Sequence, residues 1–238
     1  MSYSYTDLLA LLGIGGAHPG GLALTRAIFE ELQISEDTCI LEVGCGTGQT
    51  TGFIISNYPC SLHAIDAHPT MIQKATKRLN QHKYPVTILE ANVEKIPYKA
   101  QMFDIVLSES VTVFTNINKT IPEYYRVLRN GGSLILIEMT EIHPFDENEK
   151  KELIQFYGIK QLLNEQQWEE QFRSAGFQEI QTIHVSEEHF VNLEEDFSEF
   201  DMSEDIEPKL FNKLENHEAL TLKYKEKLGF RVFICKKN

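Results

Sequence analysis

Short runs of aliphatic and β-branched residues alternate with longer stretches of helical periodicity between about residues 38 and 139. This alternation is typical of repeated β-α units, which build a parallel sheet with helices against its faces. The sequence predicts buried strands at 38–43, 61–66, 103–108 and 133–138, and a weaker strand at 85–90. It predicts helices at about 50–57, 69–80 and 119–129, the last ending at Asn130-Gly131-Gly132. The fold class is therefore predicted to be α/β with a mostly parallel sheet.

The segments on either side of this region have different patterns. A short helix is predicted at 5–12, then a glycine-rich stretch at 13–21, then a second helix with a buried stripe of Leu24, Ile28 and Leu32. Beyond residue 139 the sequence predicts a polar helical stretch at about 146–175, a strand at about 178–185, a lysine-rich helix and an aromatic strand at 229–235. We expect three parts: an N-terminal helical cap at 1–37, a core at 38–139, and a C-terminal part at 140–238 that completes the sheet and carries an insertion at 186–228.

The charge balance narrows the range of partners. The chain has 22 Lys and Arg against 35 Asp and Glu, a formal net charge of −13. Such a chain repels a phosphate backbone unless its basic residues gather on one face, so nucleic acid is disfavoured as a partner. Residues 187–207 contain ten acidic residues and no Lys or Arg, and we expect this stretch to be either a solvated helical flap or partly mobile.

The termini and cysteines indicate a cytoplasmic protein. The first seven residues lack the basic start and apolar run of a signal peptide, and no stretch approaches the length of a membrane span. The four cysteines, at 39, 45, 60 and 235, are too few for a disulfide scaffold and lack the spacing of a zinc site. We therefore expect free thiols and no metal site.

A glycine-rich turn follows the first predicted core strand. The strand ends near Glu42, and Gly44, Gly46 and Gly48 follow at alternate positions. Glycines in this arrangement let the backbone approach a ligand closely and direct its amides toward it. A dinucleotide site would require glycine at position 49, which is Gln49, and a phosphate-binding P-loop would require a lysine that is absent.

Five motifs in register extend this observation. They are Leu41 to Gly48, Asp66 to Ile72, Ala91 to Tyr98, Phe103 to Val106, and Arg126 to Gly132. Together they resemble the class I S-adenosylmethionine-dependent methyltransferases over about residues 38–139. The resemblance implies a doubly wound, seven-stranded, mostly parallel Rossmann-like sheet with helical cap insertions. It also implies S-adenosyl-L-methionine as cofactor and S-adenosyl-L-homocysteine as product.

The resemblance assigns a set of cofactor-binding residues. In such enzymes the acid at the position of Asp66 binds the ribose hydroxyls, and residues near Met71 flank the adenine. Asn92 stands where the family usually has Asp, and its carbonyl can still accept a hydrogen bond from the adenine amino group. The full set of expected cofactor-binding residues is Glu42, Gly44, Cys45, Gly46, Gly48, Asp66, Ala67, Met71, Asn92, Val93 and Ser108.

Two residues are candidates for catalysis. Glu109 follows the fourth core strand, where the carboxyl end of a parallel strand borders the ligand crevice, so it is either a base, a ligand for a substrate amine, or a surface acid. His18 lies in the glycine-rich stretch, which we interpret as a hinge or lid over the pocket. It is either a base or substrate ligand, or a capping or turn residue before Pro19.

Three functions fit these residues. The first is methylation of a small molecule, by an enzyme resembling the broad group that includes the quinone-biosynthesis methyltransferases. The second is methylation of RNA or protein, which would need a basic docking surface; the lysines at 209–237 are the only cluster in the sequence. The third is a non-catalytic module that binds S-adenosylmethionine, because a fold alone does not establish turnover. The sequence selects neither one acceptor nor an oligomeric state.

Overall fold

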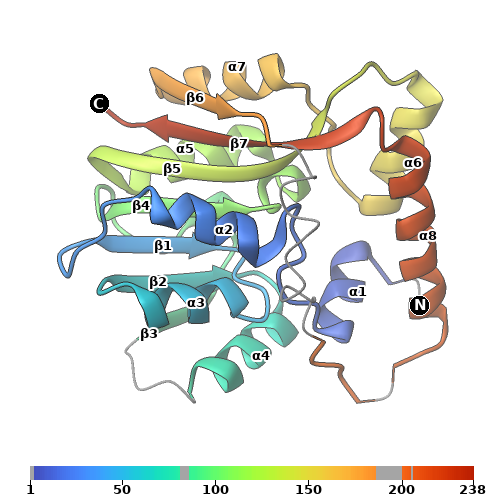
Figure 1. The fold of residues 1–238 in the computed structure, drawn as a ribbon, viewed down its shortest axis with the longest axis horizontal. Coiled ribbons are helices and arrows are strands. Elements are labelled where there is room, and N and C mark those ends of the chain that lie inside the picture. Colours follow the sequence, from blue (N-terminus) through green and yellow to red (C-terminus); the bar gives the residue numbers. More distant parts are fainter. Residues whose placement is uncertain (1–2, 81–85, 186–199, 205) are drawn as a thin grey trace.

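A computed structural model describes residues 3–80, 86–185, 200–204 and 206–238. Within these residues seven strands form one sheet in the order β3-β2-β1-β4-β5-β7-β6 (Figure 1). The first five strands pair in parallel, and β7 runs antiparallel to both β5 and β6. The strands are β1 (Cys39–Val43), β2 (Ser61–Asp66), β3 (Val86–Glu90), β4 (Phe103–Glu109), β5 (Leu128–Glu141), β6 (Glu179–Ile183) and β7 (Leu228–Lys236). The predicted α/β class and seven-stranded, mostly parallel sheet are confirmed.

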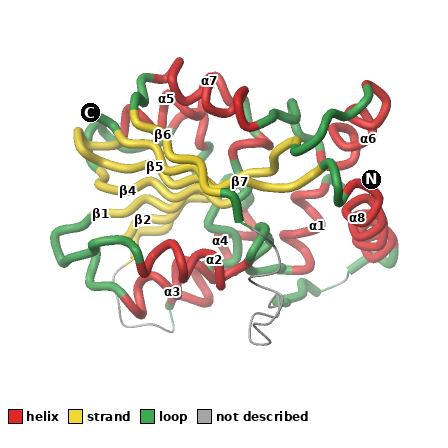
Figure 2. Tube along the Cα trace, turned by 45° about the horizontal axis from the view of Figure 1, so that its top comes forward, coloured by secondary structure: helices red, strands yellow, loops and turns green. Residues whose placement is uncertain are grey.

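Helices cover both faces of the sheet, as Figure 2 shows. The helices are α1 (Tyr5–Leu12), α2 (Gly21–Glu30), α3 (Gln49–Asn57), α4 (Pro69–Leu79), α5 (Ile117–Val127), α6 (Glu147–Tyr157), α7 (Glu165–Ala175) and α8 (Lys209–Tyr224), with short 3₁₀ turns η1 (Val93–Lys95) and η2 (Thr112–Phe114). One core packs α5 and α7 against the sheet, and a second packs α2 and α3 against its other face. The sheet is therefore doubly wound.

A third hydrophobic cluster lies beyond the carboxyl ends of the parallel strands, where α1, α6 and α8 pack together (Figure 1). Of the two helices in residues 1–37, only α1 belongs to this cluster, because Leu24, Ile28 and Phe29 of α2 pack on the sheet instead. The acidic stretch predicted at 187–207 lies mostly outside the described residues.

The strand order reverses between the adjacent strands β1 and β4. The chain continues from β1 toward one edge of the sheet and from β4 toward the other. Val43 pairs with Ser108 at the carboxyl ends of these strands. In doubly wound sheets this is the place where ligands bind, because the two loops leave in opposite directions and open a crevice. All five residues of β1 are buried, so this central strand fixes the position of the loop that follows it.

One predicted boundary is wrong. The helix expected to end at 130–132 ends at Val127, and β5 begins at the next residue. Lys237 binds the backbone around this boundary: its Nζ donates to the carbonyls of Tyr125 (2.7 Å) and Leu128 (2.8 Å), and the Gly131 amide donates to its carbonyl (2.6 Å). The polar helical stretch predicted at 146–175 contains two helices, because Gly158 ends α6 in the left-handed region (φ 73°).

Candidate functional site

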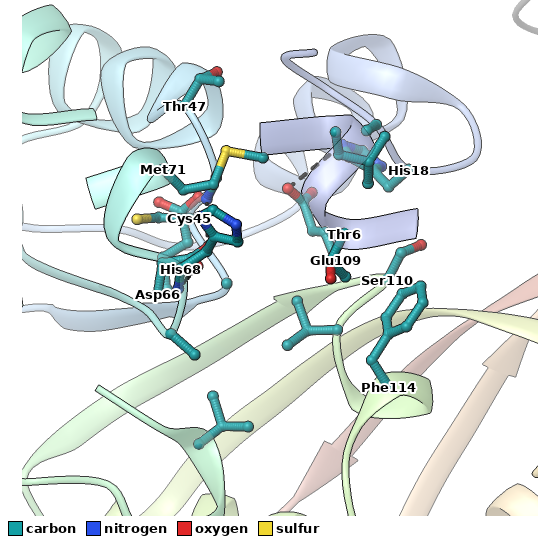
Figure 3. Close-up of a pocket in the computed structure, with 18 of the residues that line it drawn as sticks. Thr6, His18, Cys45, Thr47, Asp66, His68, Met71, Glu109, Ser110 and Phe114 are labelled. Carbon is teal, nitrogen blue, oxygen red and sulfur yellow. Dashed lines mark hydrogen bonds and ion pairs between the residues drawn. The ribbon is translucent and has the colours of Figure 1, made fainter. Parts of the chain in front are cut away.

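A cavity of about 450 Å³ opens at the carboxyl ends of β1, β2 and β4. In Figure 3 the side chains of Cys45, Asp66 and Met71 lie on one side, and those of Glu109 and Phe114 lie on the other. The first side comes from the glycine loop, the end of β2 and the start of α4. The second comes from the end of β4, and helix α1 and the loop at 14–18 complete the wall.

The glycines of the loop adopt a left-handed backbone conformation. Gly44, Gly46 and Gly48 have φ values of 67°, 55° and 77°, a region that side chains disfavour. The amides of Gly44 and Cys45 both donate to the carbonyl of Ile65, at 2.7 and 3.1 Å, which anchors the loop to the end of β2. A Cβ atom on Gly44 would lie 2.2 Å from Val111, so only glycine fits there.

Glu42 lies beneath the loop and is nearly inaccessible to solvent. Its Oε2 accepts a hydrogen bond from the Thr51 hydroxyl at 2.5 Å. Burial raises the pKa of Glu42 well above its ordinary value, although the bond from Thr51 opposes the shift. Its carboxyl group lines the cavity and joins the loop to α3.

Asp66 connects two loops at the cavity wall. Its Oδ2 accepts from the Gly46 amide at 3.0 Å, and its Oδ1 accepts from the His68 amide at 2.7 Å. Burial raises the pKa of Asp66, and the amides of His68 and Gly46 oppose that shift. Each oxygen keeps a free lone pair, so the side chain can still accept from a ligand. Ala67 and Met71 line the same part of the wall.

Asn92 and Val93 form the floor next to β3. The Asn92 Oδ1 accepts from the Glu94 amide at 2.8 Å and caps η1. This bond uses one of two lone pairs of the carbonyl that was expected to meet the adenine. Val93 is buried and lines the cavity.

The two catalytic candidates, Glu109 and His18, meet at the cavity wall. The Nε2 of His18 lies 3.4 Å from the Oε2 of Glu109, and both side chains are more than 90% buried (Figure 3). The hydroxyls of Thr25 and Thr50 donate to the two oxygens of Glu109, at 2.6 and 2.8 Å. This contact ties the N-terminal loop to the end of β4, so Glu109 is not a surface acid.

Two of the expected cofactor-binding residues do not reach the cavity. Ser108 is fully buried on the α5 side of the sheet, where its Oγ lies 3.1 Å from the Thr112 hydroxyl and 3.4 Å from that of Tyr124. Successive side chains of a strand point to opposite faces, so Glu109 faces α2 and α3 instead. Gly48 packs against Ala75 of α4.

Several residues of the wall lie outside the set of cofactor-binding and catalytic residues named from the sequence. They are Thr6, Leu9, Ile14, Gly16, Ala17, Thr47, Gln49, Thr50, His68, Pro69, Glu94, Ser110, Val111, Phe114 and Thr115. Those at 110–115 directly follow β4, so their position in sequence was a usable signal. Thr6 and Leu9 carried none, because their place depends on how α1 packs.

The wall fits a polar cofactor. The Thr47 Oγ1 is buried and has no hydrogen-bond partner within the part of the chain that the structure describes, although Thr47 lines the cavity. A buried hydroxyl without a partner is costly, so a ligand group that bonds to it would remove that cost. Gly46 has open space where a side chain would lie, which leaves its backbone accessible to a ligand.

This doubly wound sheet, with a glycine loop after β1 and an acid at the end of β2, defines a Rossmann-like cofactor-binding protein. A family model described as "Methyltransferase domain" matches residues 40–132. The "Uncharacterized methyltransferase YodH" of Bacillus subtilis (strain 168) is 36% identical over 98% of this chain and 99% of its own length. The chain belongs to the S-adenosylmethionine-dependent methyltransferases, and it is an enzyme of that class.

Two further comparisons support the fold and the family. Malonyl-[acyl-carrier protein] O-methyltransferase of Herminiimonas arsenicoxydans is 29% identical over 60% of this chain and 54% of its own. Phosphoethanolamine N-methyltransferase 2 of Haemonchus contortus, solved with S-adenosyl-L-methionine, superposes with a TM-score of 0.78 and 19% identity; the match covers 99% of this chain and 57% of that one. In the described residues no helix is long and apolar enough to cross a membrane.

Proposed function

We propose that this methyltransferase acts on a small-molecule acceptor bound between the end of β4 and helix α1. The observation that carries the proposal is the size of the cavity, whose wall is completed by α1 and the loop at 14–18. Its volume of about 450 Å³ must hold both cofactor and acceptor. Small-molecule sites span roughly 300–1,000 Å³, so the cavity has the size of such a site.

The residues proposed to hold the cofactor follow from the wall. The glycine loop and the Thr47 hydroxyl would bind its amino-acid end, Asp66 the ribose hydroxyls, and Met71, Asn92 and Val93 the adenine. S-adenosylmethionine supplies a methyl group on a positively charged sulfur, which leaves as a neutral thioether. The protein therefore mainly has to align the nucleophile and exclude water, and alignment of this kind is worth about 7–11 kcal/mol in favourable cases.

Glu109 and His18 are the groups we propose to receive a proton from the acceptor. They lie together at the wall, and their contact with each other lets either one share the proton. Thr25 and Thr50 fix the Glu109 carboxylate in place by donating to both of its oxygens. A methyl acceptor with an N–H or O–H group would need such a site when it loses its proton.

The test follows a labelled methyl group. Purified enzyme is incubated with methyl-labelled S-adenosylmethionine and a cell extract separated into small molecules, RNA and protein. We expect the label in the small-molecule fraction, and we expect Asp66→Ala to abolish its transfer. Label confined to RNA or protein would overturn the proposal. Tight cofactor binding with no label in any fraction would favour the non-catalytic module. The cytoplasmic location stays a prediction.

A further inference from the structure

The part of the cavity wall formed by α1, residue 14 and the segment after β4 is largely apolar and has no basic side chain. We call it the acceptor wall, formed by Leu9, Ile14, Ser110, Val111, Phe114 and Thr115. Figure 3 shows Ser110 and Phe114 next to Glu109 and across from Asp66. Four of the six residues are hydrocarbon, and the other two offer only hydroxyl groups. An acceptor bound here meets an apolar surface with one carboxylate at its edge.

Acidic groups dominate the charge of the whole cavity. Glu42, Asp66, Glu94 and Glu109 all line it, and no Lys or Arg does among the residues described. The basic groups in contact with the wall are already engaged. The Arg78 Nε donates to the Thr47 carbonyl at 3.0 Å, and the Lys119 Nζ pairs with Glu94 at 3.6 Å.

A negative group on the acceptor would meet no Lys or Arg in the described wall to compensate its loss of water. The two histidines that line the cavity, His18 and His68, already lie against Glu109 and Asp7. A phosphate or carboxylate moved into a partly buried site needs basic side chains, several N–H donors or a metal ion. The acceptor wall offers hydroxyl groups only. Over the described ranges no three His, Cys, Asp or Glu side chains are grouped to hold a metal ion that could bridge the anion to the acids. The carboxylates would instead repel it.

We propose that the acceptor is an apolar molecule without a phosphate or carboxylate group. If the acceptor carries a charge, it is the positive charge of an amine bound beside Glu109. This inference rests on the proposed function and deepens it. An amine gains from the acidic cavity in two ways: its positive charge complements Glu109, and its N–H can donate to the remaining lone pairs of the Glu109 oxygens. The apolar body would pack against Leu9 and Phe114.

The first experiment classifies the methylated product by charge. The labelled small-molecule fraction is passed over an anion exchanger near neutral pH, and a second portion is treated with mild alkali. We expect the label to pass through the exchanger and to survive the alkali. Retention on the exchanger would show an anionic product, and release of labelled methanol would show a methylated carboxylate; either result overturns the inference. Absence of label from small molecules would instead count against the proposed function.

The second experiment measures binding with probes that share one hydrocarbon chain. Hexylamine, hexanol, hexanoate and hexyl phosphate are titrated into enzyme saturated with S-adenosylhomocysteine. We expect the two anions to bind about tenfold more weakly than hexanol, or worse. Phe114→Lys should narrow that difference by adding a basic group to the acceptor wall, while the matched Phe114→Leu should not. Equal binding of hexyl phosphate and hexanol to the unaltered enzyme would contradict the inference.

Discussion

The Oε1 of Glu138 accepts a hydrogen bond from the backbone amide of Thr112 at 2.6 Å, and a second from Val111 at 3.0 Å. Glu138 lies on β5 and is fully buried, and its Oε2 has no partner in the described structure. The two amides begin the turn η2, which carries Phe114 to the cavity. A buried carboxyl group on one strand therefore holds the turn that follows its neighbour.

This burial predicts a pH-dependent stability. Burial raises the pKa of Glu138 from 4.5 to about 7, against the pull of the amides that donate to it. The pKa of Glu138 is higher in the folded state than in the unfolded state, so the folded state holds the proton more tightly. The contribution of Glu138 to stability therefore falls as the pH rises from about 4.5 to about 7 and is constant above that. The loss is roughly 3 kcal/mol, at 1.36 kcal/mol per pKa unit.

Glu138→Gln should remove this pH-dependent part of the stability, because a neutral amide keeps its acceptor oxygen but does not titrate. Urea unfolding of both proteins at several pH values between about 5 and 8 measures it. We expect the advantage of the unaltered protein over the variant to shrink as the pH rises. Parallel stability curves for the two proteins would refute the role given to Glu138.

Gly44→Ala should abolish cofactor binding. The new methyl group would lie 2.2 Å from the Val111 side chain and would also strain a backbone with φ 67°. The matched control is Gly131→Ala, which has φ 79° but no atom within 4 Å of the added methyl group. The control should lose only about 1–2 kcal/mol of stability, the cost of a left-handed backbone at an alanine, and should still bind S-adenosylhomocysteine. Calorimetry on both variants, together with Gly44→Ala/Val111→Ala, separates the collision from the strain. Normal binding by Gly44→Ala would disprove the packing argument.

Asp66→Asn should weaken binding of S-adenosylhomocysteine by about tenfold or more, the loss expected for a charged hydrogen bond to the ribose. The amide keeps one acceptor oxygen, so the loop contacts made by Asp66 are only partly lost. Asp104→Asn is the control, because Asp104 pairs with Arg129 and does not line the cavity. Titration calorimetry gives both affinities. Equal affinities of the two variants for S-adenosylhomocysteine would contradict the proposal that Asp66 binds the cofactor.

His18→Gln should slow methyl transfer by about 100-fold or more if the His18 and Glu109 pair receives the proton. A role limited to closing the loop at 14–18 would instead raise the acceptor KM and leave kcat nearly unchanged. Steady-state kinetics on the acceptor found by labelling distinguishes the two roles.

Local patterns were enough to predict the position of the glycine loop and Asp66 on the cavity wall. The glycine loop and Asp66 each follow a strand directly, so strand prediction also places them at one edge of the sheet. Ser108 shows the limit of that reasoning, because the face to which each strand residue points was not assigned. The backbone at the end of α5 is bound by Lys237, more than 100 residues away in the chain, a contact that local patterns do not reveal.

The acceptor wall depends on contacts between distant parts of the chain. Leu9 lines the cavity and follows Tyr5 by one turn of α1, and both side chains pack in the cluster that α1 forms with α8. Within the described residues α8 contributes nothing to the cavity itself. Substitutions on the buried side of α8 should thus shift α1 at the acceptor wall and leave the glycine loop intact. If the acceptor wall binds the substrate as proposed, substrate preference can evolve through a helix that does not line the cavity.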